Sequence, residues 1–168
     1  MRVELAIALD LCVIGSNACG NTTLYFENFD SLPLQTSVSY TPPVPNAFTH
    51  TPPSGWVRDA SGVPGVGDPD FGIFEWEGWS FARKGFWETV GGDRRREFLF
   101  AQGTVAVADP DEWNDLGDPA NKIGFYNTQL NTPLINFSSP DTGARKLAFD
   151  SSWFPQCCDD GDNTNNQT

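Results

Sequence analysis

The chain has 168 residues, of which 22 are acidic and 10 are basic, giving a formal net charge of −12. This length gives one domain, and the negative charge disfavours binding to nucleic acid or to anionic lipid, both of which require a basic face. The composition is rich in aromatic residues, glycine and proline, and no apolar run reaches the roughly 20 residues of a membrane span, so we expect a folded chain of strands and turns.

The first 18 residues resemble a secretory signal peptide. Arg2 precedes an apolar stretch, and residues 16–18 form a small-x-small cleavage site. Glu4 and Asp10 are charges that such a stretch does not normally contain, so an ordinary leading segment is the alternative. A signal peptide would make the protein secreted, either extracellular or periplasmic.

Residues 19–158 are predicted to form one antiparallel β-sandwich module of about seven or eight short strands. The strongest local signal is a hairpin of residues 97–101 and 104–108 around Gln102-Gly103. Phe86 to Val90 fit one helical turn, and an acidic loop covers 109–121. The other expected strands are 23–29, 54–58, 71–82 (strand-like or irregular), 126–130, 134–137 and 145–150.

The C-terminal segment 159–168 is a polar loop with no strand after it. A sheet rarely ends on such a loop, so we expect a truncation point there and a sandwich that lacks its C-terminal strands. The adjacent Cys157 and Cys158 are either ordinary thiols or, in an oxidising compartment, one of them bridges to Cys19.

Two groups of carboxylates are candidate calcium ligands. Residues 109–115 follow a predicted strand directly, and neighbouring carboxylates repel one another unless a cation or an arginine neutralises them. Calcium takes carboxylate and carbonyl oxygens, although a solvated acidic loop or a pairing with one of the arginines at 94–96 would also account for this pattern. The candidate ligands in this loop are Asp109, Asp111, Glu112 and Asp115.

Glu27 and Asp150 are the second group, on the first and a late predicted strand. The first and last strands of a jelly roll often lie together, so these two carboxylates are predicted to share a structural calcium ion. The alternative is that each pairs with an arginine or faces water.

Tryptophan side chains are candidate glycan contacts, because aromatic rings stack on the apolar faces of sugars. We select Trp76, Trp79 and Trp113, although core packing would explain most tryptophans equally well. Glu75 and Glu77 resemble part of a glycosidase strand, but the aspartate and the third acid of that pattern are missing. With His50 as the single histidine and no complete catalytic constellation, we predict no hydrolase activity for this chain.

Several motifs together resemble a jelly-roll module of secreted environmental bacterial proteins. The resemblance covers residues 23–168 and implies a module that accompanies hydrolases, such as calcineurin-like metallophosphoesterases, or anchored surface proteins. The metal motifs of the phosphoesterase domain itself are not in this chain, so such activity would belong to a missing C-terminal domain of the same polypeptide. The motifs are the runs 26–32, 52–56, 62–69, 78–82, 104–113, 126–128 and 149–153.

The sequence therefore predicts a secreted, non-catalytic binding or accessory module that binds a glycan and is stabilised by calcium. The alternatives are the N-terminal fragment of a secreted hydrolase (metallophosphoesterase or glycosidase) and a structural spacer in a surface protein.

Overall fold

The computed structural model describes residues 6–10, 23–91, 94–116, 126–136 and 147–152. This part of the chain consists mostly of short antiparallel strands with a few short helices, consistent with an all-β fold. Among the described residues, no helix is long and apolar enough to cross a membrane. The predicted cleavage site, the three cysteines Cys19, Cys157 and Cys158, and the polar loop 159–168 lie outside the described residues.

The larger sheet has six strands in the order β2-β1-β6-β5-β3, with β8 also paired to β1. All of these pairings are antiparallel. β1 falls inside the segment that the sequence suggested as a signal peptide, and it was not predicted as a strand. The strands are β1 (Ala6–Asp10), β2 (Phe26–Glu27), β3 (Phe48–Thr49), β5 (Ser80–Arg83), β6 (Thr104–Val107) and β8 (Ala148–Ser152).

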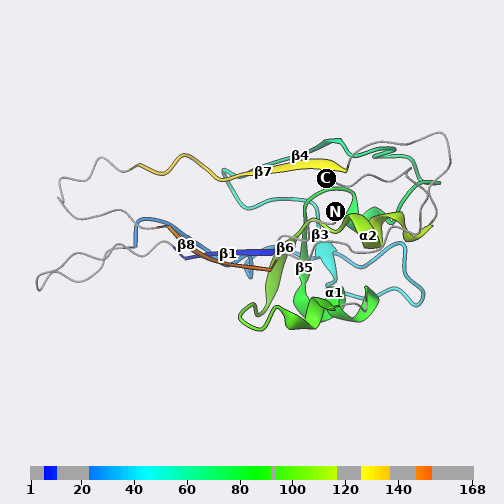
Figure 1. The fold of residues 1–168 in the computed structure, drawn as a ribbon, viewed down its shortest axis with the longest axis horizontal. Coiled ribbons are helices and arrows are strands. Elements are labelled where there is room, and N and C mark those ends of the chain that lie inside the picture. The colour runs from blue at the N-terminus through cyan, green and yellow to red at the C-terminus, as the bar shows by residue number, and fades with distance from the viewer. Residues whose placement is uncertain (1–5, 11–22, 92–93, 117–125, 137–146, 153–168) are drawn as a thin grey trace, which may run out of the picture.

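The smaller sheet pairs β4 (Val57–Gly62) with β7 (Asn127–Asn131). Figure 1 shows this pair as a second layer beside the larger sheet. One apolar cluster contains side chains from both sheets: Phe81 of β5 and Ala106 of β6 are buried, and Leu130 of β7 packs against them. The two layers therefore share a core.

A second core lies on the opposite face of β6 and is covered by the helices. Because neighbouring side chains of a strand point to opposite faces, Val105 and Val107 enter this core while Ala106 enters the first one. The helices are α1 (Lys84–Val90), α2 (Pro110–Trp113) and the 3-10 turns η1 (Phe74–Trp76), η2 (Arg94–Glu97) and η3 (Asn114–Leu116).

The predicted hairpin of 97–101 and 104–108 is wrong. Residues 94–97 form η2 instead, and Phe98 is buried while Leu99 and Phe100 are exposed, which is not the alternation of a half-buried strand. β6 pairs with β5, reached through α1 and η2. Of the strands expected at 126–130 and 134–137, the first is present as β7 and pairs with β4, whereas residues 134–136 lie in no strand and residue 137 is outside the described residues.

The helical turn predicted at 86–90 is confirmed and extended, since α1 covers Lys84–Val90. The late strand predicted at 145–150 is present as β8, shifted toward the C-terminus. The acidic loop at 109–121 begins with α2 and η3. Thus most elements are found where apolar patterns predicted them, with errors in their partners and ends.

Candidate functional site

A buried ion pair lies at the centre of the helix-covered core. Arg95 of η2 and Asp109, at the end of β6, have fully buried side chains, and Arg95 Nε lies 2.7 Å from Asp109 Oδ2. The same carboxylate oxygen accepts a hydrogen bond of 2.8 Å from the indole Nε1 of Trp87. The other oxygen, Oδ1, caps α2 by accepting from the backbone N–H of Glu112 at 3.1 Å. Asp109 is therefore neutralised and held by three partners.

Glu112 extends this arrangement into a chain of buried polar groups. Trp76 Nε1 donates to the Tyr40 hydroxyl, which donates to Glu112 Oε1, both at 2.7 Å. Arg95 Nη2 lies 3.5 Å from Glu112 Oε2. Burial raises the pKa of Glu112 to about 7, although the Tyr40 hydrogen bond and the Arg95 charge oppose this shift. We call Arg95, Asp109, Glu112 and Tyr40 the arginine cluster.

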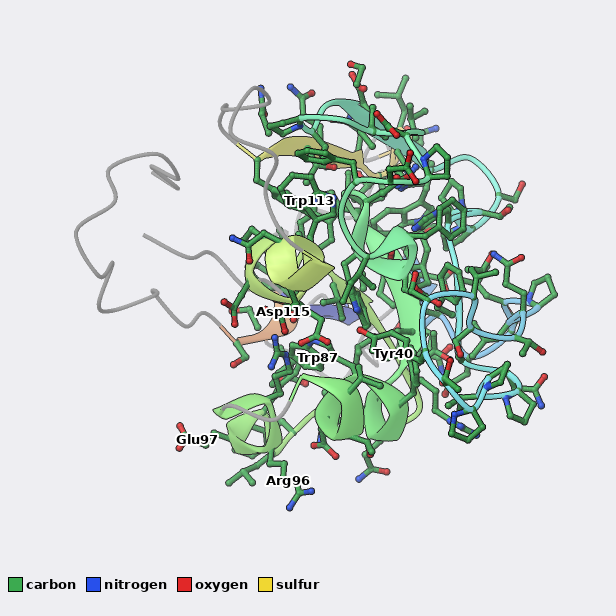
Figure 2. All side chains as sticks on the ribbon, turned by 90° about the vertical axis from the view of Figure 1, so that its right-hand side faces the viewer. Tyr40, Trp87, Arg96, Glu97, Trp113 and Asp115 are labelled. Atoms are coloured by element: carbon green, nitrogen blue, oxygen red, sulfur yellow. The ribbon has the colours of Figure 1, made fainter. Side chains whose placement is uncertain are left out.

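Figure 2 shows two side chains of this region that point into the core and two that point to the surface. Tyr40 and Trp87 point inward between the helices, whereas Arg96 and Glu97, in the same turn as Arg95, point outward. The 3-10 turn therefore sends one of its arginines into the core and its neighbour to solvent.

Arginine supplies the positive charge for which the sequence analysis considered calcium. Besides Asp109, the Arg95 guanidinium lies 3.7 Å from Asp111 Oδ2. Asp115 is exposed at the start of η3. Within the described ranges, no group of three or more histidine, cysteine, aspartate or glutamate side chains is arranged to hold a metal ion. The pairing of one arginine with the 109–115 segment is the alternative that the structure contains.

The second predicted calcium pair is separated by the strand register. Glu27 and Phe149 both lie opposite Leu9 of β1, and Asp150 lies opposite Ala8. Directly opposed residues share a face of the sheet and successive residues alternate, so Glu27 and Asp150 project from opposite faces. Glu27 instead accepts the backbone N–H of Phe29 at 2.6 Å. The expectation that these two carboxylates meet at one ion does not fit this register.

The three tryptophans selected as glycan contacts lie in the core. Trp76 stacks on Phe86 with ring centroids 5.9 Å apart, and Trp113 packs against Phe71 at 5.6 Å. Trp79 belongs to the cluster shared by the two sheets. All three side chains are buried, so core packing, the alternative explanation, accounts for them.

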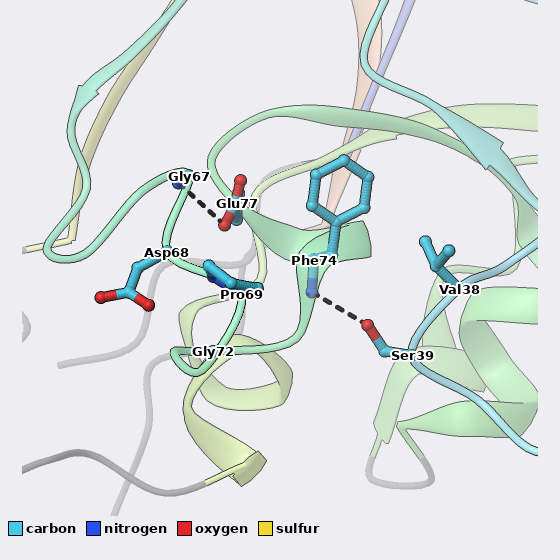
Figure 3. A pocket seen from close by; sticks show the side chains of 8 residues that line it. All are labelled: Val38, Ser39, Gly67, Asp68, Pro69, Gly72, Phe74 and Glu77. Atoms are coloured by element: carbon cyan, nitrogen blue, oxygen red, sulfur yellow. Dashed lines mark hydrogen bonds between the residues drawn. The ribbon is translucent and has the colours of Figure 1, made fainter.

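An open pocket of about 440 Å³ lies on the surface beside η1 (Figure 3). Val38 and Ser39 form one side, residues 67–69 and Gly72 the other, and Phe74 stands between them. Phe74 is 42% exposed, although His50 and Phe48 contact its ring at centroid distances of 5.0 and 6.0 Å. The Glu77 carboxylate completes the wall.

Hydrogen bonds to η1 and its flanks hold the pocket walls in place. Glu75 Oε1 accepts the backbone N–H groups of Val38 at 2.5 Å and Ser39 at 2.9 Å. The Ser39 hydroxyl accepts the N–H of Phe74 at 3.1 Å. Glu77 Oε1 accepts the N–H of Gly67 at 3.1 Å, where a φ of +78° favours glycine. The pocket walls are therefore held by hydrogen bonds within the chain itself.

Glu77 is nearly buried, and its carboxylate forms no salt bridge with a lysine or arginine of the described residues. It is 5% exposed, and burial raises the pKa of its carboxyl group. Arg58 lies near but donates from Nη2 to the backbone carbonyl of Glu77 and from Nε to that of Trp79. Burial, followed by the charge of Arg58, lowers the pKa of His50 to about 4, so this ring is neutral at neutral pH.

Sequence reasoning singled out Glu75 and Glu77 as neighbours but did not anticipate the pocket. Its other wall comes from residues 38–39, more than 30 positions away, and no local pattern links them to η1. The α2 start did have a signal, because Asp109-Pro110-Asp111-Glu112 has a capping aspartate, proline at the first helical position and glutamate at the third. Read this way, the acidic loop would have been predicted to begin with a helix.

Comparison with known proteins found no matching family model, no matching curated protein and no matching solved structure.

Proposed function

We propose that this protein is a non-catalytic binding module and that its ligand site is the pocket beside η1. The observation that carries the proposal is the combination, in about 440 Å³, of an exposed aromatic ring, an apolar rim and carboxylate acceptors. Small-ligand sites typically join apolar walls with a few convergent polar groups that are formed before binding.

A saccharide is the ligand class that suits these walls. Phe74 offers a ring on which the apolar face of a sugar can stack, and Val38 and Pro69 extend this surface. Asp68 and Glu77 are acceptors for sugar hydroxyls at the edge of the same space. This site replaces the buried tryptophans as the place of glycan contact.

The placement of the acids supports binding rather than hydrolysis. A glycosidase needs two carboxyl groups that face the substrate from either side of the scissile bond. Glu75 is completely buried and uses Oε1 to hold the backbone of Val38 and Ser39. Its geometry is that of an anchor for a loop, so it is not available to a substrate in the pocket.

The other parts of the proposal come from the sequence. They are a jelly-roll-like arrangement of the two antiparallel sheets, secretion, and a hydrolase or surface-anchored polypeptide that contains this module. The core shared by β5, β6 and β7 supports the sandwich arrangement.

A saccharide panel tests the proposed function. We expect the purified chain to bind at least one neutral or amino-sugar oligomer in calorimetry, and Phe74→Ala to weaken that binding about tenfold through loss of stacking. Phe100→Ala is the matched control, because Phe100 is 80% exposed and does not line the pocket. Absence of binding across the panel, or equal loss in both variants, would contradict the proposal.

A further inference from the structure

The pocket wall carries a nearly buried carboxylate, Glu77, that forms no salt bridge with another described residue, and this bears on which ligand the pocket selects. The Glu77 side chain lines the cavity in Figure 3, and only one of its oxygens, Oε1, has a hydrogen bond, from the N–H of Gly67. Among the described residues, no lysine or arginine lines the pocket. A desolvated carboxylate in this setting lacks the charge partner that buried acids usually have.

The nearest cation among the described residues does not remove this deficit. The Arg58 guanidinium is used by the backbone carbonyls of Glu77 and Trp79, and its attraction for the Glu77 carboxylate is outweighed by the effect of burial. His50 contacts the Phe74 ring but is not among the residues that line the pocket, and with its pKa lowered to about 4 it is neutral at neutral pH; Asp68 is a second acid on the rim. The charged side chains that line the cavity among the described residues, Asp68 and Glu77, are therefore both acidic.

The Phe74 ring also favours a positively charged ligand. The face of an aromatic ring attracts cations as well as apolar groups, and the ring is partly exposed at the cavity. A ligand ammonium placed between Phe74 and Glu77 would gain both the cation–π contact and a charge-assisted hydrogen bond to the free carboxylate oxygen.

We propose that the pocket selects saccharides that carry a free, protonated amine, with Glu77 as the group that binds the ammonium and Phe74 as the ring that contacts it. This inference rests on the proposed function and names its ligand class. An N-acetylated or neutral sugar of the same shape has no positive charge to offer Glu77, so it binds more weakly.

Calorimetry with three probes tests the inference: a glucosamine oligomer with free amines, the N-acetylglucosamine oligomer of equal length, and an alkyl diamine without a sugar ring. We expect the free-amine oligomer to bind about tenfold or more tightly than the acetylated one, the range expected for a hydrogen bond to a charged group. The diamine should bind more weakly than the free-amine oligomer because it cannot stack.

Two isosteric variants distinguish binding of the amine in the pocket from nonspecific electrostatic attraction to an acidic protein. Glu77→Gln keeps an acceptor for Gly67 N–H and removes the charge, so it should abolish the preference for the free amine while the melting temperature stays near that of the wild type. Glu88→Gln removes an equal charge from α1, where Glu88 pairs with Lys84 outside the pocket, and should retain the preference.

Each outcome has one meaning. Equal binding of the free-amine and acetylated oligomers, or a preference that survives Glu77→Gln, overturns the inference and leaves saccharide binding in place. Binding of the diamine as tightly as the free-amine oligomer overturns the saccharide part of the proposed function. No binding of any probe overturns both.

Discussion

Two groups of buried acids in this protein differ in what balances their charge. In the arginine cluster, Arg95 lies within 2.7 Å of Asp109 and 3.5 Å of Glu112, deep in the core. Beside the pocket, Glu75 and Glu77 are equally buried but are held mainly by backbone N–H groups. The carboxylates of the first group are paired with Arg95 inside the core, whereas Glu77 of the second group lines a cavity and Glu75 anchors the loop beside it.

This difference separates structural acids from an acid that can serve a ligand. A buried carboxylate with an arginine partner stabilises one arrangement of the chain, and removing that partner leaves an uncompensated charge. A buried carboxylate that lines a cavity and has no salt bridge to another described residue can still bind a positively charged group of a ligand. Both groups contain carboxylates, so their surroundings decide which carboxylates are structural and which one can bind a ligand.

The largest effect should follow loss of the cation in the arginine cluster. Arg95→Met leaves the fully buried Asp109 carboxylate without its ion pair, so we expect the free energy of unfolding to fall by about 3–5 kcal/mol in urea denaturation. Arg96→Met, the exposed neighbour in η2, should change it by less than about 0.5 kcal/mol. Similar losses in both variants would show that Arg95 is not the structural cation.

A pH-dependent effect of similar size is expected at Glu112. Its pKa is near its ordinary value in the unfolded chain and about 7 in the folded one, so the folded state binds the extra proton between these values. Stability from this group is therefore full at low pH and is lost as pH rises toward about 7, by on the order of 3 kcal/mol.

Glu112→Gln cannot ionise, and it should remove this slope. Urea midpoints of the wild type and the variant should be similar at pH 4 and diverge by pH 8, with the variant more stable. The variant leaves unchanged the other residues that shift the pKa of Glu112, which are Tyr40, Arg95, Asp109 and Asp115. Parallel pH profiles of the two proteins would contradict the assignment.

A smaller and local effect is expected at the pocket anchor. Glu75→Ala removes the acceptor for the backbone N–H groups of Val38 and Ser39, which should cost about 1–3 kcal/mol and speed hydrogen exchange at these two amides. Glu88→Ala, which removes only a surface pair with Lys84, should leave their exchange unchanged. Unchanged exchange in Glu75→Ala would mean that other contacts hold this loop.

The smallest effect should come from calcium. The sequence predicted calcium stabilisation, whereas Arg95 already lies beside the Asp109, Asp111 and Glu112 carboxylates. We therefore expect melting temperatures in excess calcium and in chelator to agree within about 2 °C, since a native-state ligand at a hundredfold excess over Kd would add about 2.7 kcal/mol and shift the midpoint further. A larger rise with calcium would restore the predicted metal site.

The local sequence patterns of this chain predicted the positions of helices and strands better than they predicted which strands pair with each other. The run 104–108 alternates between two cores as a buried strand does, and the prediction of a helical turn at 86–90 is confirmed by α1. The hairpin prediction failed because residues 94–97 form a 3-10 turn and Phe98, directly after it, packs into the core. The apolar residues of 97–101 do not reveal that β6 pairs with β5. Strand partners depend on contacts that are distant in the sequence.

The candidate site shows the same limit. Sequence reasoning allowed an arginine from 94–96 to answer the 109–115 acids, and Arg95 does so across 14 residues. It could not find Tyr40 against Glu112, 72 residues apart, nor the pocket wall that Glu75 builds from residues 38–39. The prediction that three tryptophans contact a glycan was wrong because the spacing of tryptophans in the sequence does not show whether their rings are exposed.

The most direct test of the contrast between the two acid groups is an amide chemical-shift map of the full chain titrated with the free-amine glucosamine oligomer. The account predicts shifts at Val38, Ser39 and Gly67, whose amides donate to Glu75 and Glu77. The indole signals of Trp76 and Trp87, which donate to Tyr40 and Asp109 of the arginine cluster, should not change. Shifts centred on those indoles, or none at the three pocket amides, would contradict it.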